Sequence, residues 1–393
     1  MKTYTILGLL FITLFPSVAS AQEEISLYDA VVYQYSKYYP RPQTGLAFLP
    51  SGSHFIYQES IDGKPSYMIA NSEDASTKPW FSLEQFNEWD GSEELSKRFP
   101  SFDWQTDTEA IYTLDGQVYK KLNVANQTTE IILDLPGKIE NLSINENYTA
   151  YAYTESNNLF VRNLDGSMQK VTTDGGNGIV YGESVSRNEF GINGGIFWSN
   201  DGTKLAFYRK DESMVGEYPL VHIDEVPATA EMIRYPMAGS MSEKISLGVY
   251  DLETKETYFI HPEGEPEQYL TAIGWTNNDS EIAIGVLNRD QNYLKMNTYK
   301  SSDGSKLNTL FELNSEKYVE PEHALWNLDD NRSIWLGEID GWQHAHLIEN
   351  GKTGSNQLTE GNFEAHKLLA FESESNQLIF TGTGEEIVSG KFK

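Results

Sequence analysis

Apolar and polar positions follow one repeated pattern along most of this chain: an apolar run, a short polar turn and a second apolar run. The clearest copy begins with Ile196-Phe197-Trp198, turns at Asn200-Asp201-Gly202 and continues as Leu205-Ala206-Phe207-Tyr208. An Asp-Gly step between two aromatic-rich runs supplies the positive φ that a tight β-hairpin needs. Further copies begin at Leu46, Phe102, Leu142, Ile273, Leu325 and Leu369. The pattern predicts many short antiparallel strands.

The spacing of these copies indicates repeated structural units. Successive copies lie 40 to 77 residues apart, and repeats of roughly 40–50 residues with several strands each are typical of β-propeller blades. We therefore expect an all-β propeller of about seven blade repeats over residues 46–393, with little helix. The residues taken as equivalent, each just before a turn, are Phe48, Trp104, Ile144, Trp198, Trp275, Trp326 and Phe371.

The spacing of the repeats is irregular in two places, and each irregularity predicts a further feature of the propeller. The longest interval holds a segment rich in Pro and Met around Asp211 to Ser242, which we expect to be an insertion that crosses one face of the propeller. After Phe371 only 22 residues remain, about half of a ~45-residue blade. We therefore expect the last blade to be incomplete and the propeller to be open at its C-terminal end.

The N-terminal residues have the pattern of a targeting segment. Lys2 is followed by the apolar run Ile6 to Phe15 and by the small residues Ala19-Ser20-Ala21, which predicts a signal peptide over residues 1–21. A buried strand or a membrane anchor is the alternative, but the apolar run is shorter than the ~20 residues of a membrane span. Residues 22–45 are expected to connect the signal peptide to the propeller, and we expect no membrane span after cleavage.

Composition excludes several classes of protein and partner. Aromatic residues make up 12% of the chain, which fits strands and excludes a disordered chain. No cysteine is present, so disulfides, thiolate catalysis and cysteine-bound metals are excluded. The formal net charge of −29 disfavours nucleic acid as a partner. This acidity would favour cationic ligands such as peptide amino termini, although solubility alone is the alternative explanation.

Candidate chemistry is concentrated just before the clearest hairpin. Arg187, Asn188 and Glu189 place charged and polar groups on a segment between glycines, where a pure scaffold has little need of them. We therefore take Glu189 as the candidate working group. No serine has glycine at both the −2 and +2 positions that a nucleophile elbow requires, so we expect no catalytic residue in this chain. His344 and His346 would share a strand face, but no carboxylate pattern accompanies them, and we expect neither a metal nor a cofactor.

Several ordered motifs carry a family resemblance. They are NEFGI from Asn188, FWSNDGTKLAFYRKDESMV from Phe197, YPMAG from Tyr235, YVEP from Tyr318 and DGW from Asp340. Together they resemble the β-propeller domain of dipeptidyl peptidase IV and its bacterial relatives, a family with eight blades. The resemblance is strongest between about Gly178 and Gly361 and extends more weakly to about Tyr39. It implies a bacterial source and, with the signal peptide, a periplasmic or extracellular location.

The resemblance also implies roles for particular residues. In this family a pair of adjacent glutamates on a short helical excursion binds the free α-amino group of the substrate. Glu189 falls on the second position of that pair, whereas Asn188 occupies the first and departs from the pattern. Arg187, Arg209 and Asp211 are candidate supporting residues. For Arg209 and Asp211 we favour an ion pair at a blade edge over a role at the site.

Two functional hypotheses follow. In the first, the chain is the substrate-gating and amine-binding propeller of an exported dipeptidyl peptidase IV-like serine peptidase, and its partners are peptides with a free N-terminus. The α/β-hydrolase domain with the catalytic triad would be missing or separately encoded, so the chain alone is expected to be inactive. In the second, the chain is a stand-alone periplasmic propeller of the TolB type that binds a protein or peptide.

Overall fold

The computed structural model describes residues 25–37, 43–91, 96–135, 137, 139–349, 354 and 356–384. The predicted signal peptide and the last residues of the chain lie outside this described part. Strands dominate it, and the helices are α1 (Leu27–Val32), α2 (Leu83–Asp90) and the short 3-10 turn η1 (Ser186–Asn188). None of the helices in the described ranges is long and apolar enough to cross a membrane. The all-β character expected from the apolar pattern is confirmed.

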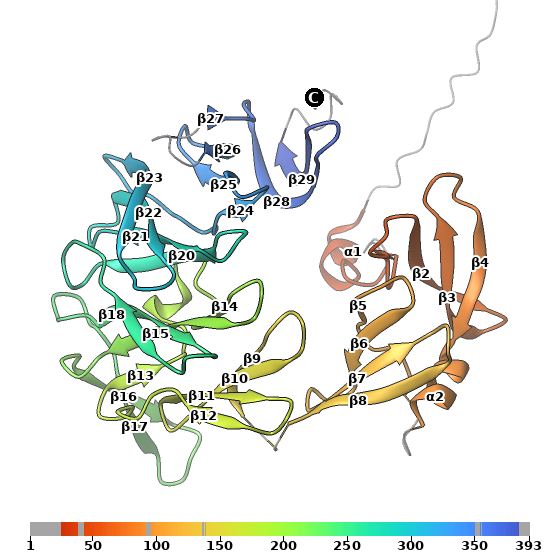
Figure 1. Ribbon diagram of the computed structural model, residues 1–393, viewed down its shortest axis with the longest axis horizontal. Helices are drawn as coiled ribbons and strands as arrows, with labels where there is room; N and C mark the ends of the chain where they lie inside the picture. The colour runs from red at the N-terminus through yellow and green to blue at the C-terminus, as the bar shows by residue number, and fades with distance from the viewer. Residues whose placement is uncertain are drawn as a thin grey trace, which may run out of the picture. The chain divides into compact units, whose positions relative to one another are not determined.

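The strands form successive antiparallel sheets along the chain, which we number as blades 1 to 7 (Figure 1). Blades 1, 2 and 3 each have four strands in chain order. Their strands are β1 (Ala47–Phe48), β2 (His54–Ile61), β3 (Lys64–Asn71) and β4 (Thr77–Ser82); β5 (Asp103–Trp104), β6 (Glu109–Thr113), β7 (Val118–Asn123) and β8 (Thr128–Asp134); and β9 (Glu140–Ile144), β10 (Ala150–Glu155), β11 (Asn158–Asn163) and β12 (Met168–Lys170).

Blade 4 differs because two strand segments, β13 and β14, both pair with β15. Its strands are β13 (Ile179–Tyr181), β14 (Ile196–Trp198), β15 (Lys204–Asp211), β18 (Lys244–Asp251) and β19 (Thr257–Ile260). Between β15 and β18 the chain forms a separate two-stranded hairpin, β16 (Glu217–His222) and β17 (Thr229–Arg234). This insertion hairpin occupies the Pro- and Met-rich segment that the spacing had marked (Figure 1).

Blades 5 and 6 have four strands each, and blade 7 has two among the residues that the structure describes. The strands are β20 (Tyr269–Trp275), β21 (Glu281–Leu287), β22 (Tyr293–Lys300) and β23 (Lys306–Asn314); β24 (Trp326–Asn327), β25 (Arg332–Glu338), β26 (Gln343–Glu349) and β27 (Asn356–Gln357); and β28 (Phe363–Glu372) and β29 (Gln377–Gly384). Each of the seven positions taken as equivalent lies on the first strand of its blade, or on β14 in blade 4.

The chain divides into two compact units. One comprises the described residues up to Ala110 together with Asn123–Thr128, and the other comprises Ile111–Leu122 together with the described residues from Thr129 onward. The division falls within blade 2. All residues of the candidate site described below belong to the second unit.

The β14–β15 hairpin forms as its turn residues predict. Gly202 has φ +71°, and its N–H donates to the carbonyl of Ser199 at 2.9 Å. Beyond the turn, Trp198 pairs with Leu205 in the antiparallel register. Phe207 is fully buried, and Gly248 on β18 makes room for its ring, since a Cβ there would lie 2.4 Å from Cζ of Phe207.

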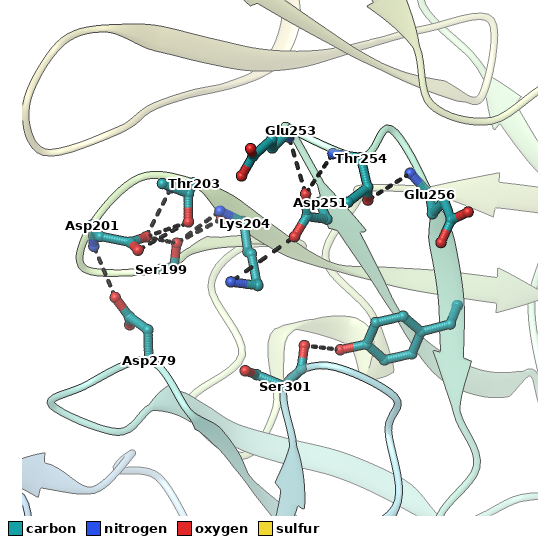
Figure 2. Close-up of polar contacts among 11 residues, drawn as sticks. Ser199, Asp201, Thr203, Lys204, Asp251, Glu253, Thr254, Glu256, Asp279 and Ser301 are labelled. Atoms are coloured by element: carbon teal, nitrogen blue, oxygen red, sulfur yellow. Dashed lines mark hydrogen bonds and ion pairs between the residues drawn. The ribbon is translucent and has the colours of Figure 1, made fainter.

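Side chains from one blade bond to the backbone of the preceding one. The indole of Trp198 donates to the carbonyl of Ser143 in blade 3 at 3.2 Å, and that of Trp275 donates to the carbonyl of Phe197 in blade 4 at 3.1 Å. The buried carboxylate of Asp279 accepts the backbone N–H groups of Asn200 and Asp201, both at 2.9 Å. Figure 2 shows the bond to Asp201. Because the acceptors or donors in the preceding blade are backbone groups, these bonds fix the register between neighbouring blades.

Neither α1 nor α2 was expected from the sequence. Helix α2 begins after Ser82, whose side chain accepts the N–H of Gln85 while the Gln85 side chain accepts the N–H of Ser82, and it ends at Gly91 with φ +65°. The reciprocal cap at Ser82 and Gln85 and the C-terminal glycine are both recognisable sequence signals for helix ends. The helix has only eight residues, so its periodicity was too short to predict it.

Candidate functional site

The candidate site begins at η1, the turn between β13 and β14. Ser186, Arg187 and Asn188 have φ values of 51°, 56° and 62°, in the left-handed region that L-residues rarely adopt. The turn is closed by its own backbone, because the N–H of Asn188 donates to Val185 and that of Glu189 donates to Ser186, both at 3.1 Å. Three consecutive non-glycine residues in this conformation are strained, and such strain is concentrated at functional sites.

Glu189 stands at the end of this turn with extended backbone and an exposed side chain. The residue after it is anchored from another blade. The ring of Phe190 is buried with its centroid 4.8 Å from that of Tyr269, and its carbonyl accepts the hydroxyl of Thr271 at 2.5 Å. At Gly191 a Cβ would lie 1.9 Å from the carbonyl oxygen of Glu322. The backbone that carries the Glu189 carboxylate is therefore fixed, while the carboxylate itself faces solvent.

Asn188 is exposed as well, but its side chain has a partner. The Oδ1 atom of Asn188 accepts a hydrogen bond from the hydroxyl of Ser184. An amide oxygen has two lone pairs, so one remains for a ligand.

Arg187 is held by the insertion. Its guanidinium donates to the carbonyl of Arg234 at 3.1 Å and lies 4.3 Å from the ring centroid of Tyr235, within the range of a cation–π interaction. Arg234 in turn donates from Nη1 to the carbonyl of Val215 at 2.9 Å. The two arginines thus fasten the insertion hairpin to η1 and to the segment that follows β15.

Arg209 and Asp211 lie on the same face of β15 and pair with one another, with Nη1 3.9 Å from Oδ2. Arg209 also donates from Nε to the hydroxyl of Tyr181 at 3.2 Å. Burial alone would raise the pKa of the Asp211 carboxyl, but hydrogen bonds from Ser213 and the charge of Arg209 outweigh it, and the pKa is lowered. Asp211 is therefore a carboxylate at neutral pH, and its charge is matched within the strand.

A groove with a volume of about 910 Å³ lies between η1 and the insertion hairpin. Arg187 and Asn188 line it from the turn, whereas Glu189, Arg209 and Asp211 are not among its lining residues. The groove has more acidic than basic side chains. Its charged lining residues are Arg187, Lys210, Glu212, Glu217, Glu231, Arg234 and Glu243.

Sequence reasoning missed several of the residues that build this region. Glu243 accepts the backbone N–H of Ser186 at 3.1 Å, although it lies 57 positions away in the sequence. Thr271 likewise bonds to the carbonyl of Phe190, the residue after Glu189, and the ring of Tyr235 lies against Arg187 in the turn. Tyr235 stands in a motif that the family resemblance uses, but no local signal distinguishes Glu243 or Thr271 from other residues of their type.

His344 and His346 lie on the same face of β26, and both are buried. His344 bonds through Nδ1 to the hydroxyl of Thr359 at 3.1 Å, and His346 bonds through Nε2 to the carbonyl of Gly337 at 3.3 Å. Within the described ranges, no group of three or more His, Asp or Glu side chains is placed to hold a metal ion. These histidines belong to the packing of blade 6.

Comparison with known proteins gives a consistent result. Residues 101–390 match the family model described as the dipeptidyl peptidase IV (DPP IV) N-terminal region. The chain is 28% identical over 205 residues to the "Probable dipeptidyl-aminopeptidase B" of Phaeosphaeria nodorum, which covers 47% of this chain and 22% of that protein. It is 27% identical over 283 residues to the protein of the same name from Pyrenophora teres, covering 63% of this chain and 31% of the relative.

Solved structures extend the likeness to the fold. A candidate dipeptidyl aminopeptidase IV from Bacteroides ovatus superposes with a TM-score of 0.74 at 29% identity, over 88% of this chain and 50% of that one. Dipeptidyl peptidase 4 of Porphyromonas gingivalis superposes with a TM-score of 0.67 at 21% identity, over 92% of this chain and 52% of that one. The chain therefore spans about half the length of these two proteins. The β-propeller predicted from the repeats is confirmed.

Proposed function

This chain belongs to the family of DPP IV N-terminal regions, and we propose that it is the substrate-gating, amine-binding propeller of an exported DPP IV-like serine peptidase. In this proposal the propeller admits short peptides and holds their free α-amino group. An α/β-hydrolase domain, encoded with this chain or separately, supplies the catalytic serine. The targeting pattern at residues 1–21 supports export to the periplasm or the extracellular space.

The observation that carries the proposal is the setting of Glu189. Its side chain is exposed, yet its backbone is fixed on one side by the η1 turn and on the other by buried Phe190. The backbone of Glu189 is preorganised, so the conformational entropy lost on binding is confined to the side chain. An ammonium group offers three N–H donors, and a carboxylate forms charge-assisted hydrogen bonds with it.

The charge around the turn supports the same ligand. The groove beside Asn188 is lined by four glutamates against two arginines and one lysine, and the whole chain has a formal net charge of −29. Both arginines are engaged with carbonyl groups of the protein, and Lys210 lies 3.3 Å from Glu212. A positively charged peptide terminus would therefore find acceptors here without displacing a strong internal ion pair.

The experiment that tests this function is a binding comparison. Isothermal titration calorimetry of the chain would use Gly-Pro-Gly-Gly with a free amino terminus and the same peptide with an N-acetyl group. We expect the free peptide to bind at least tenfold more tightly, and Glu189→Gln to remove most of that preference, because charge-assisted hydrogen bonds contribute ~1.5–3 kcal/mol. Equal affinity of the unmodified chain for the two peptides would contradict the proposal.

A further inference from the structure

We propose that Glu243 is a second amine-binding carboxylate, which takes the place of the glutamate that Asn188 replaces. This inference rests on the proposed function, since it names another residue of the same site. Family resemblance points to two adjacent glutamates, but the sequence offers only one at this turn. The structure brings a second carboxylate to the turn from just before β18.

The position of Glu243 is set by the turn itself. Its Oε1 atom accepts the N–H of Ser186, the first residue of η1, at 3.1 Å, and the carbonyl of Ser186 accepts the N–H of Glu189. One hydrogen-bonded turn therefore connects the two carboxylate-bearing residues. Glu243 and Asn188 both line the groove, so a ligand bound there can reach both residues, and Glu189 follows Asn188 directly in the chain.

Asn188 alone is a poor replacement for a glutamate. It carries no charge, and its Oδ1 atom already accepts the hydroxyl of Ser184. A neutral acceptor forms a weaker hydrogen bond to an ammonium group than a carboxylate does. If the ammonium is to be held by two charged acceptors, the second must come from another segment.

The other groove carboxylates are less suited to this role. Glu212 lies 3.3 Å from Lys210 in an ion pair, and Glu231 lies 3.6 Å from His222 on the insertion hairpin. Glu217 lies opposite Arg234 in the hairpin register. Among the groove carboxylates of the described chain, Glu243 is the one that is hydrogen-bonded to η1. Its side chain is half-buried, so an ion pair with a bound ammonium group would be screened less than one at the surface.

The test uses Glu243→Gln, which removes the charge but keeps an oxygen that can accept the Ser186 N–H. Calorimetric titration with Gly-Pro-Gly-Gly and its N-acetyl form should show the free peptide bound about tenfold more weakly and the acetylated peptide unchanged. Glu256→Gln is the matched control, because Glu256 is an exposed residue at the β18–β19 turn (Figure 2). It changes the net charge equally and should leave both affinities as they are.

A rescue variant strengthens the design. Asn188→Glu, introduced together with Glu243→Gln, should restore most of the lost affinity, because it returns a carboxylate to the turn. Melting temperatures of all variants verify that the fold is kept.

The possible failures are distinguishable. If Glu189→Gln weakens the free peptide tenfold and Glu243→Gln does not, the inference is wrong and the proposed function stands. If Glu243→Gln weakens both peptides equally, Glu243 shapes the groove and does not bind the amine, and the inference is again wrong. If the unmodified chain binds both peptides equally, the proposed function and the inference are both wrong.

Discussion

The β14–β15 hairpin and the η1 turn follow one another in blade 4, but they are held in different ways. The hairpin is held by regular cross-strand pairing and by side chains such as Phe207 that have no exposed surface. The turn lies between buried Val185 and Phe190, but three of its residues, Arg187 to Glu189, are exposed. Single hydrogen bonds to distant segments help to hold it: the N–H of Ser186 donates to Glu243, and Arg187 donates to the carbonyl of Arg234.

Because of this difference, we expect the hairpin to contribute mainly to the stability of the fold and the turn mainly to ligand recognition. A buried hairpin stabilises the fold through the apolar surface that it buries and through close packing, so a loss of side-chain volume there lowers the stability. A turn held by a few polar contacts adds little stability, but it can present exposed groups in a fixed geometry. We therefore expect substitutions in the hairpin to change the free energy of unfolding, and substitutions around the turn to change mainly amine binding.

The largest effect is expected at the core of the hairpin. Phe207→Ala should reduce the free energy of unfolding by about 3–5 kcal/mol, because it removes a fully buried ring and leaves a cavity. Urea unfolding followed by tryptophan fluorescence measures the change. Phe48→Ala is the matched control, since Phe48 is 69% exposed, and should cost less than about 1 kcal/mol. Similar losses at the two positions would contradict the assignment of Phe207 to the core.

The next effect concerns the contact between neighbouring blades. Asp279→Ala should cost about 3 kcal/mol, because the backbone N–H groups of Asn200 and Asp201 both lose their acceptor. Glu253→Ala, at an exposed turn of blade 4 (Figure 2), should be nearly neutral. Chemical unfolding of both variants checks this prediction. An unchanged stability in Asp279→Ala would show that these two hydrogen bonds do not stabilise the contact between the blades.

A substitution at Thr271 should have an intermediate effect and should change both stability and amine binding. Thr271→Val removes the hydroxyl that bonds to the carbonyl of Phe190 and should cost about 1–2 kcal/mol, because that carbonyl is left without its donor. It should also reduce the preference for a free amino terminus, since Phe190 follows Glu189 directly. Thr271→Ser keeps the hydroxyl and should restore the preference. If Thr271→Val loses stability but keeps the full preference, the turn does not depend on this anchor.

The smallest effect is a pH dependence in blade 6, away from the turn. Burial lowers the pKa of His346 and nearby His344 lowers it further, against the opposing effects of the Gly337 carbonyl and Asp340. The unfolded chain therefore binds a proton near pH 6.5 that the native chain does not, and stability should fall as the pH drops below that value. Between pH 7.5 and pH 5.5 we expect His346→Gln to reduce this loss by about 1 kcal/mol.

The control for this dependence is His366→Gln, because His366 is exposed. Its pH dependence should match that of the unmodified chain in urea unfolding at the two pH values. An equal slope in His346→Gln would show that His346 does not carry the effect.

The repeated hairpins could be predicted from the sequence because each is encoded locally. At Trp198 and Leu205 the apolar alternation specifies the strands and the intervening Asp201-Gly202 specifies the turn, so no distant residue is needed. The insertion near Asp211 could also be located, since it lengthens one interval of the repeat. Helix α2 was missed because a two-turn helix has too few residues to show a period.

The candidate site could be predicted only in part. Glu189 and Asn188 stood out because charged and polar residues between glycines depart from the blade pattern. Glu243 and Thr271 did not stand out, because their importance comes from contacts with residues 57 and 81 positions away in the chain. A periodic pattern reports local structure, whereas an acceptor delivered by another segment is known only once the chain is folded.

The way the insertion leaves and re-enters blade 4 has an evolutionary consequence. β15 and β18 pair without interruption from Lys204 opposite Asp251 to Asp211 opposite Lys244, so the chain departs and returns at two directly facing residues. A segment of any length that closes across this pair leaves the ladder beneath it intact. The insertion, which forms one wall of the groove and includes Glu243, can therefore become longer, shorter or different in sequence during evolution without changes in the core of blade 4.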